Sequence, residues 1–213
     1  VSRNGDLLSR VWVQGLTAYS QINYVECEIG GQVIDKQYGA WMQMWTELTH
    51  NLDSRLLLNA CATGSMLPLQ FWFCRNPGLA LPLIALQYHE VKLNIDVDSS
   101  ATVTKVWCDY IFLDTDERRR FAQVSHEYLI EQTQFSNKLS VESGSNQHEL
   151  RFNHPVKELM WQLADSTNKA VADKVTLQLN GHDRFKTRGA AYFQYVQRYQ
   201  HHSGCGGLHT SVK

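Results

Sequence analysis

Short segments that alternate between apolar and polar side chains recur along this chain, and they limit its possible folds more than any other feature. Residues 22–29 alternate in this way, Gly30 and Gly31 follow, and we expect residues 32–38 to return as a second strand. Alternation with a period of two is typical of a strand that buries one face and wets the other. A glycine pair between two such segments predicts a β-hairpin.

The same reasoning assigns the remaining elements. We expect further strands at residues 7–16, 66–74, 88–97, 106–113, 127–135 and 173–179, and a tight turn at Asn180-Gly181. We expect loops at residues 50–65 and 136–147, a short helix interrupted by Pro82 at 79–86, and a helix or charged loop at 114–125.

One segment has helical periodicity instead. Trp41, Met44, Trp45 and Leu48 are spaced i, i+3, i+4 and i+7, which predicts a short amphipathic helix with these side chains on its buried face. A helix this short is not stable alone, so we expect it to pack against the turn and apolar run at residues 75–86.

Many short strands and few helices predict an all-β protein, a sandwich or barrel. Asp98-Ser99-Ser100 is a polar break, after which the strand pattern starts again. We therefore expect two similar β modules in tandem, at residues 1–98 and 99–213.

Composition excludes several classes of protein. The formal net charge is −1, so the chain lacks the excess of Lys and Arg that binds nucleic acid. The longest apolar stretch, 79–86, is too short to span a bilayer, and no signal peptide is recognisable.

The five cysteines are odd in number and widely spread, which favours reduced thiols and folding in the cytosol. The chain does not begin with Met, so we expect it to be part of a longer protein.

His182-Asp183-Arg184 could belong to a hydrolytic site. No Ser or Cys nucleophile sits in a strand–turn–helix elbow nearby, so a turn after a strand is the better interpretation.

Two groups of histidines could suggest a metal site: His148 with His154, and His201-His202 with Cys205 and His209. Zinc sites usually contain ligand pairs at short fixed spacing, such as Cys-x2-Cys, and none is present.

Two further groups could contact a ligand. Arg118-Arg119-Arg120 follows three acidic residues, and a mutually paired charged surface is the better interpretation. The aromatic residues could stack on bases or sugars, but their positions in strands and on a helix favour core packing. They are Trp41, Trp45, Phe71, Trp72, Phe73, Trp107, Tyr110, Phe112 and Trp161. We therefore predict no catalytic, cofactor-binding or metal-binding residue.

Five segments resemble the major capsid proteins of nucleocytoplasmic large DNA viruses, such as algal viruses and their giant relatives. They are ECEIGGQVIDKQYG at 26–39, FWFCRNPGLALPLIALQYHEV at 71–91, DYIFLDTDERRRFA at 109–122, NHPVKEL at 153–159 and LNGHDRF at 179–185. The chain departs from the family at Gln37, where His is usual, and after His202, where the resemblance ends.

This resemblance implies a double jelly roll that is truncated here at both ends, with short helices in its loops. It implies a non-enzymatic subunit that forms homotrimers of pseudo-hexagonal outline, which tile the icosahedral shell of a large double-stranded DNA virus. The expected partners are copies of itself in neighbouring capsomers, with minor capsid and penton proteins, and neither nucleic acid nor a membrane interior. The expected location is the virion, after assembly in host cytoplasm. The alternative is a jelly-roll carbohydrate-binding or cupin-like domain.

Overall fold

The computed structural model describes residues 1–163 and 172–204. The chain divides into two compact units. Residues 1–43 and 57–154 form the first unit, and residues 44–56 and those from 155 onward form the second. The two units are described separately.

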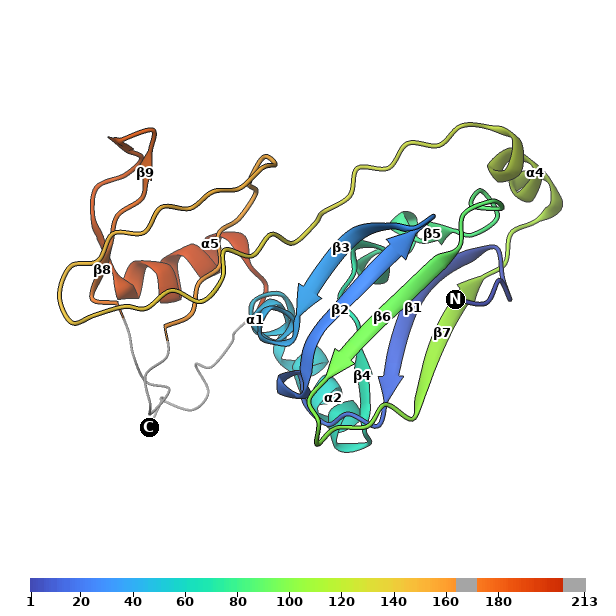
Figure 1. Cartoon of the computed structure of the whole chain (residues 1–213), viewed down its shortest axis with the longest axis horizontal. Coiled ribbons are helices and arrows are strands. Elements are labelled where there is room, and N and C mark those ends of the chain that lie inside the picture. The colour runs from blue at the N-terminus through green and yellow to red at the C-terminus, as the bar shows by residue number, and fades with distance from the viewer. Residues whose placement is uncertain (164–171, 205–213) are drawn as a thin grey trace. The chain divides into compact units, whose positions relative to one another are not determined.

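The first sheet of the first unit, sheet B, is built around the predicted hairpin. β2 (Ile22–Ile29) lies between β3 (Gln32–Tyr38) and β6 (Val91–Val97), and all neighbours are antiparallel (Figure 1). Gly30 and Gly31 connect β2 to β3 with φ of 60° and 86°, a region that glycine enters without steric cost. The predicted hairpin is confirmed.

The second sheet, sheet A, is centred on β1 (Leu7–Gln14). β4 (Met66–Pro68) and β5 (Leu81–Pro82) pair with one side of β1, and β7 (Lys105–Ile111) pairs with the other. A strand that follows the predicted module boundary therefore completes a sheet that begins before it. The division into jelly-roll modules at 98 and 99 stays a prediction.

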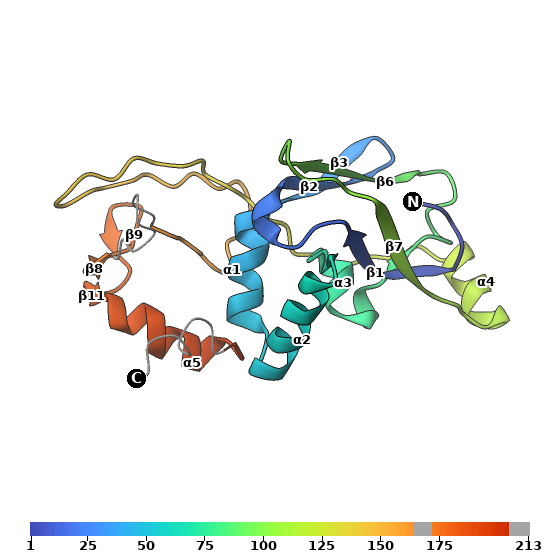
Figure 2. The ribbon, with the colours of Figure 1, turned by 90° about the horizontal axis from the view of Figure 1, so that it is seen from below.

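The two sheets of the first unit bury one shared hydrophobic core. Leu8, Val11 and Val13 of β1 and Val25 and Cys27 of β2 are all at most 1% exposed (Figure 2 shows both sheets from below). Strands in two sheets with few helices confirm the expected all-β class at this level.

Helix α1 (Gly39–Thr49) confirms the predicted helix but not its buried face. The buried side chains are Met42 and Thr46, at 0% and 4% exposure, whereas Met44 and Trp45 are only partly buried. The prediction was wrong because several apolar side chains lie all round the helix, so spacing alone did not select the buried face.

The loop expected at 50–65 was wrong, since α2 (Leu52–Thr63) occupies most of it. Asn51 accepts a hydrogen bond from the backbone N–H of Ser54 through Oδ1 at 2.8 Å, which satisfies a free donor of the first turn. Leu56 and Leu57 are 59% and 68% exposed, so α2 buries no continuous apolar stripe that would have revealed it in the sequence.

The segment 66–86 also differs from the prediction. The expected strand 66–74 ends at Pro68, and α3 (Trp72–Arg75) follows. The expected helix at 79–86 is replaced by a 3-10 turn at Pro77–Leu79 and by β5. Pro82 cannot donate a backbone hydrogen bond inside a helix, but it fits a short edge strand.

The rest of the first unit contains a 3-10 turn (Tyr19–Gln21) and α4 (Thr115–Gln123). Asp114 caps α4 by accepting from the backbone N–H of Glu117 at 2.8 Å. From 124 to 163 the chain has neither helix nor strand, so the strand expected at 127–135 was wrong as a hydrogen-bonded element.

The second unit holds only short elements among its described residues from 155 onward. They are β8 (Lys174–Val175), β9 (Gln178–Leu179), β10 (His182–Asp183), β11 (Arg188–Gly189), a π-helical segment (Tyr192–Gln197) and α5 (Arg198–His201). β9 and β10 form a hairpin around Asn180-Gly181, as predicted. In the described part of the chain, no helix has the length and apolar character needed to cross a membrane.

Candidate functional site

The inner face of β3 carries polar side chains where a sandwich normally places apolar ones. Asp35 and Gln37 are two residues apart, so the strand directs both toward the interior, where they are 2% and 0% exposed. Gln70, which precedes α3, is 6% exposed. Buried polar groups destabilise a fold unless they are hydrogen-bonded, so the partners of these three side chains define the site.

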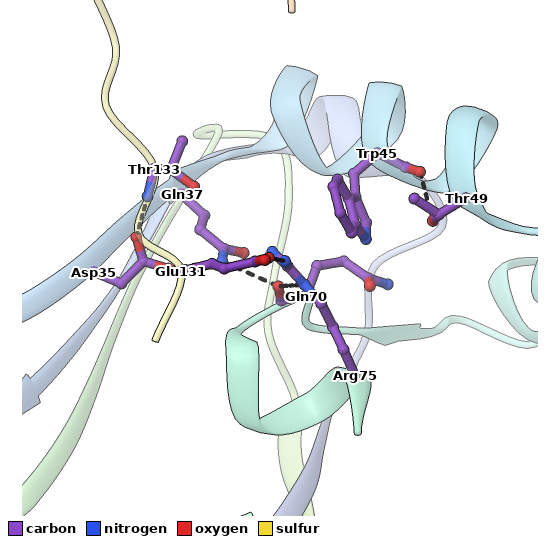
Figure 3. Close-up of polar contacts among 8 residues, drawn as sticks. All are labelled: Asp35, Gln37, Trp45, Thr49, Gln70, Arg75, Glu131 and Thr133. Atoms are coloured by element: carbon purple, nitrogen blue, oxygen red, sulfur yellow. Dashed lines mark hydrogen bonds and ion pairs between the residues drawn. The ribbon is translucent and has the colours of Figure 1, made fainter. Parts of the chain in front are cut away.

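Gln37 connects the other two residues. Its Nε2 donates to Asp35 Oδ2 at 2.8 Å and to the backbone carbonyl of Gln70 at 3.0 Å (Figure 3). The side chain of Gln70 donates to the Tyr19 hydroxyl at 3.2 Å, and that hydroxyl donates to the carbonyl of Pro68 at 2.8 Å. The Oε1 atom of Gln37 is buried and has no hydrogen-bond partner among the residues that the structure describes.

Arg75, at the end of α3, joins the same carbonyl to an acidic residue. Its Nε donates to the carbonyl of Gln70 at 3.0 Å, and its Nη1 forms an ion pair with Glu131 Oε2 at 2.8 Å (Figure 3). Its guanidinium lies 5.3 Å from the centre of the Trp41 ring, a cation–π distance. The expected packing of the 41–48 helix against the segment that begins at Arg75 is therefore confirmed for Trp41.

Residues 131–135, which we call the strap, also contact the polar side chains and the backbone of β3. The backbone N–H of Thr133 donates to Asp35 Oδ1 at 2.8 Å (Figure 3). The side chain of Gln132 donates to the carbonyl of Ile34, and the ring of Phe135 lies 4.7 Å from that of Tyr38. Asp35 thus accepts one hydrogen bond from its own strand and one from the strap.

Burial sets the protonation behaviour of the site. Desolvation raises the pKa of Asp35. The hydrogen bonds from Thr133 and Gln37 and the positive charge of Arg75 lower it, but by less, so the pKa stays raised. Desolvation also lowers the pKa of Arg75, although the negative charges of Glu131 and Asp35 partly offset this by raising it.

Thiols and a phenol near the site are held in their neutral forms. Burial raises the pKa of Tyr19, Cys27 and Cys74 to about 12 in each case. A cysteine nucleophile needs a thiolate, which apolar surroundings disfavour. The arrangement can therefore hold chain segments together, and it offers no activated nucleophile.

The residues singled out in the sequence do not come together in this network. Asp183 lies in the exposed β9–β10 hairpin and accepts a hydrogen bond from Gln178 at 2.7 Å, which agrees with the turn interpretation. His202 is bonded to Glu158 at 2.5 Å, while His148 and His154 are exposed. Cys205 and His209 lie outside the described residues.

The basic triplet is paired as interpreted, whereas the core packing expected of the aromatic residues holds for only part of that set, and Trp161 is among the exposed ones. Arg118 pairs with Asp6 at 2.9 Å, and Arg119 lies 4.0 Å from Asp116. The rings of residues 71–73 are buried, whereas Trp107 and Phe112 are 49% and 69% exposed. Within 1–163 and 172–204, no cluster of three or more His, Cys, Asp or Glu side chains could hold a metal ion.

Sequence reasoning did not single out Asp35, Gln70 or Glu131. The available signal was a pair of polar residues on one face of β3, at Asp35 and Gln37, next to a strongly predicted hairpin. The partners lie 33 or more residues away along the chain, so their convergence needed the tertiary structure.

Two family profiles match the sequence. Residues 1–104 match the profile described as major capsid protein N-terminus, and residues 117–174 match that of the large eukaryotic DNA virus major capsid protein.

Individual capsid proteins are similar over nearly the whole chain. The major capsid protein of Pyramimonas orientalis virus is 47% identical, over 95% of this chain and 62% of the relative. That of Paramecium bursaria Chlorella virus 1 is 36% identical, over 94% of this chain and 64% of the relative. The chain thus spans less than two thirds of the length of these relatives.

Two solved structures have the same fold over this length. The crystal structure of PBCV-1 VP54, fitted into a reconstruction of the virophage Sputnik, has a TM-score of 0.83 at 36% identity. The match covers 97% of this chain and 70% of that one. A quasi-atomic model of the PBCV-1 virus capsid has a TM-score of 0.73 at 34% identity, over 94% of this chain and 68% of that one.

Proposed function

The chain belongs to the family of major capsid proteins of large eukaryotic DNA viruses, and from this premise we propose that it is a structural subunit of the virion shell. The observation that carries the proposal is the match to VP54, with a TM-score of 0.83 over 97% of the chain. Fold similarity alone would not indicate function, but here it coincides with 36% sequence identity. The subunit assembles with other copies of itself.

The finer architecture in this proposal is a double jelly roll, with a first module at 1–98 and a second at 99–213. Sheet B and the strands β1, β4 and β5 of sheet A support the first module, because two antiparallel sheets with a common core form a rigid β-sandwich. The second module begins, in this proposal, with β7, whose pairing with β1 ties it to the first.

The proposed assembly is a homotrimer of pseudo-hexagonal outline that tiles an icosahedral shell. Closed rotational symmetry lets one chain present the same lateral surfaces around a ring, which suits a shell built from many identical copies. Minor capsid and penton proteins are further proposed partners, and host cytoplasm is the proposed place of assembly.

We further propose that the subunit has no catalytic activity, cofactor or resident metal. The polar side chains buried beneath β3 support this, since they bond to one another and to backbone groups of the core. Shell building needs large complementary surfaces, and an active site adds nothing to that task.

The experiment is native mass spectrometry and negative-stain microscopy of the complete protein, expressed from its whole reading frame. We expect a trimer with a hexagonal outline and no bound metal. A monomer that binds stoichiometric metal, or that binds oligosaccharides in a glycan array, would favour the cupin-like or carbohydrate-binding alternative instead.

A further inference from the structure

Within residues 1–163 and 172–204, strand β3 pairs with β2 alone and therefore forms one edge of sheet B. The strap, residues 131–135, runs beside the other side of β3 (Figure 1). Its contacts advance in the same direction as the strand: Gln132 to Ile34, Thr133 to Asp35, and Phe135 to Tyr38. The strap therefore runs in the same direction as β3 along the side of β3 that does not pair with β2.

No ladder of backbone hydrogen bonds joins the strap to β3 in the described part of the chain. Side chains take its place. The carboxylate of Asp35 accepts from the backbone N–H of Thr133, and the amide of Gln132 donates to the backbone carbonyl of Ile34. One side chain thus stands between the two backbones at each contact, which keeps the strap from becoming a strand of the sheet.

Contacts at both ends hold the strap in this position. Glu131 pairs with Arg75 at 2.8 Å at one end, and Phe135 packs on Tyr38 at the other. Just before the strap, Ile130 is partly buried against the core, whereas Leu129 is 92% exposed.

An open edge strand is a template for pairing with another chain, and proteins usually block it. We propose that the strap blocks the edge of β3, and that without it β3 would pair with β3 of a second copy of this chain. The second copy is the fitting partner because an antiparallel pair of identical edges is related by a twofold axis. Each unpaired N–H and carbonyl of one copy then meets its complement on the other. The inference goes beyond the proposed shell function and does not depend on it.

The test removes a single hydrogen bond of the strap. Thr133→Pro deletes the N–H that binds Asp35, while Thr133→Ala removes the side chain and keeps the N–H, so it is the matched control. Gln132→Ala is a second variant, at an exposed residue, that uncovers the carbonyl of Ile34. The intact 213-residue chain is studied by sedimentation over a concentration series, with hydrogen exchange of residues 32–38.

We expect Thr133→Pro to raise the self-association constant about tenfold or more over wild type, with Thr133→Ala unchanged. Gln132→Ala should shift it in the same direction. Hydrogen exchange should slow in residues 32–38 of the associated species, because its edge amides become paired. Should Thr133→Pro fail to fold, Gln132→Ala decides the question. The proposal is overturned if the folded test variant, Thr133→Pro or otherwise Gln132→Ala, has the same self-association constant as Thr133→Ala. It is also overturned if the variant associates but hydrogen exchange in residues 32–38 does not slow.

Discussion

Asp35 is the residue whose environment has the clearest physical consequence. It lies on the inner face of β3 at 2% exposure, yet it is surrounded by two donors and the charge of Arg75. Desolvation outweighs these partners, so the pKa of Asp35 is raised. The folded protein therefore favours the protonated carboxyl more than the unfolded chain does.

The first prediction follows from the sign of that shift. As the pH rises above about 3.8, the unfolded chain loses its proton from Asp35 while the folded protein still holds it. The stabilisation by protonated Asp35 is complete below that pH and is lost as the pH rises through the raised pKa of the folded state. Asp35→Asn, which cannot ionise, should therefore become steadily more stable relative to wild type over this acidic range.

Urea unfolding at a series of pH values measures this difference. Asp98→Asn removes one negative charge at an exposed position and is the control. A stability difference between Asp35→Asn and wild type that stays constant with pH would show that the carboxyl does not titrate as inferred.

The second prediction concerns cysteine reactivity. Cys27 is buried and Cys74 is partly buried, and desolvation raises the pKa of both thiols to about 12, so very little thiolate is present at pH 8. Brief alkylation of the native protein should modify Cys61, which is only partly buried, well before either of them. Peptide mapping after denaturation in a second label gives the order, and early labelling of Cys27 would contradict the inferred core. The expected reduced state of all five thiols can be counted in the same experiment.

At the scale of elements, the face of α1 that is buried differs from the face that the sequence predicted. The spacing of apolar residues favoured the face with Met44 and Trp45, whereas the structure buries Met42. Met42→Ala should lower the free energy of unfolding by about 2–5 kcal/mol, the usual effect of truncating a fully buried side chain. Met44→Ala, the same change on the same helix, should cost clearly less. Chemical denaturation measures both variants. If Met42→Ala and Met44→Ala lowered the free energy of unfolding equally, Met42 would not be on the more deeply buried face.

The start of α1 makes a separate prediction. A Cβ on Gly39 would overlap the backbone carbonyl oxygens of Tyr19 and Ile22. Backbone must move to relieve such contacts, so Gly39→Ala should destabilise the protein by roughly 1–3 kcal/mol or more. Gly78→Ala is the control, since its nearest contact would be an ordinary 3.4 Å from Asn76. Thermal unfolding compares the two, and a similar melting temperature for both variants would mean that the turn before α1 is loosely packed.

These elements also show how far sequence reasoning extends. The β2–β3 hairpin was predictable because its signals are local: an alternating strand that leads directly into a glycine pair. Segment 127–135 was expected to be a strand as well, yet it forms no ladder, because side chains of β3 and the strap separate the two backbones. Periodicity indicates which residues face inward, but pairing depends on the tertiary neighbour.

The site was less predictable than the fold. That Asp35 and Gln37 share one face of β3 follows from their spacing, and a buried polar pair implies partners. Nothing in the sequence selects Gln70, Arg75 and Glu131 as those partners, because their approach depends on how α3 and the strap fold back on the sheet. The family itself was recognisable from its segments, since those are contiguous.

At the scale of the whole molecule, burial is distributed very unevenly. The first unit contains the continuous hydrophobic core, with residues such as Phe71, Phe73 and Leu83 at or below 1% exposure. Among the described residues of the second unit, Thr46 is the only buried one. Local opening requires little free energy where few apolar contacts are broken, so the two units should differ in how readily they open.

The last prediction concerns the long segment without regular secondary structure, which crosses from the first unit into the second. Residues 124–163 contain no helix or strand, and Lys138, Arg151 and Lys157 are exposed trypsin sites within them. Lys36 and Lys92 lie instead within β3 and β6, where cleavage requires local unfolding of sheet B. Brief trypsin digestion of the native chain should therefore cut first at the three sites between 138 and 157 and leave a resistant core that contains both sheets. Mass spectrometry of the early fragments identifies the order, and urea-unfolded chain provides the reference rates for each site. If Lys36 and Lys92 were cleaved as early as Lys138, the sandwich would not be the stable part of the molecule.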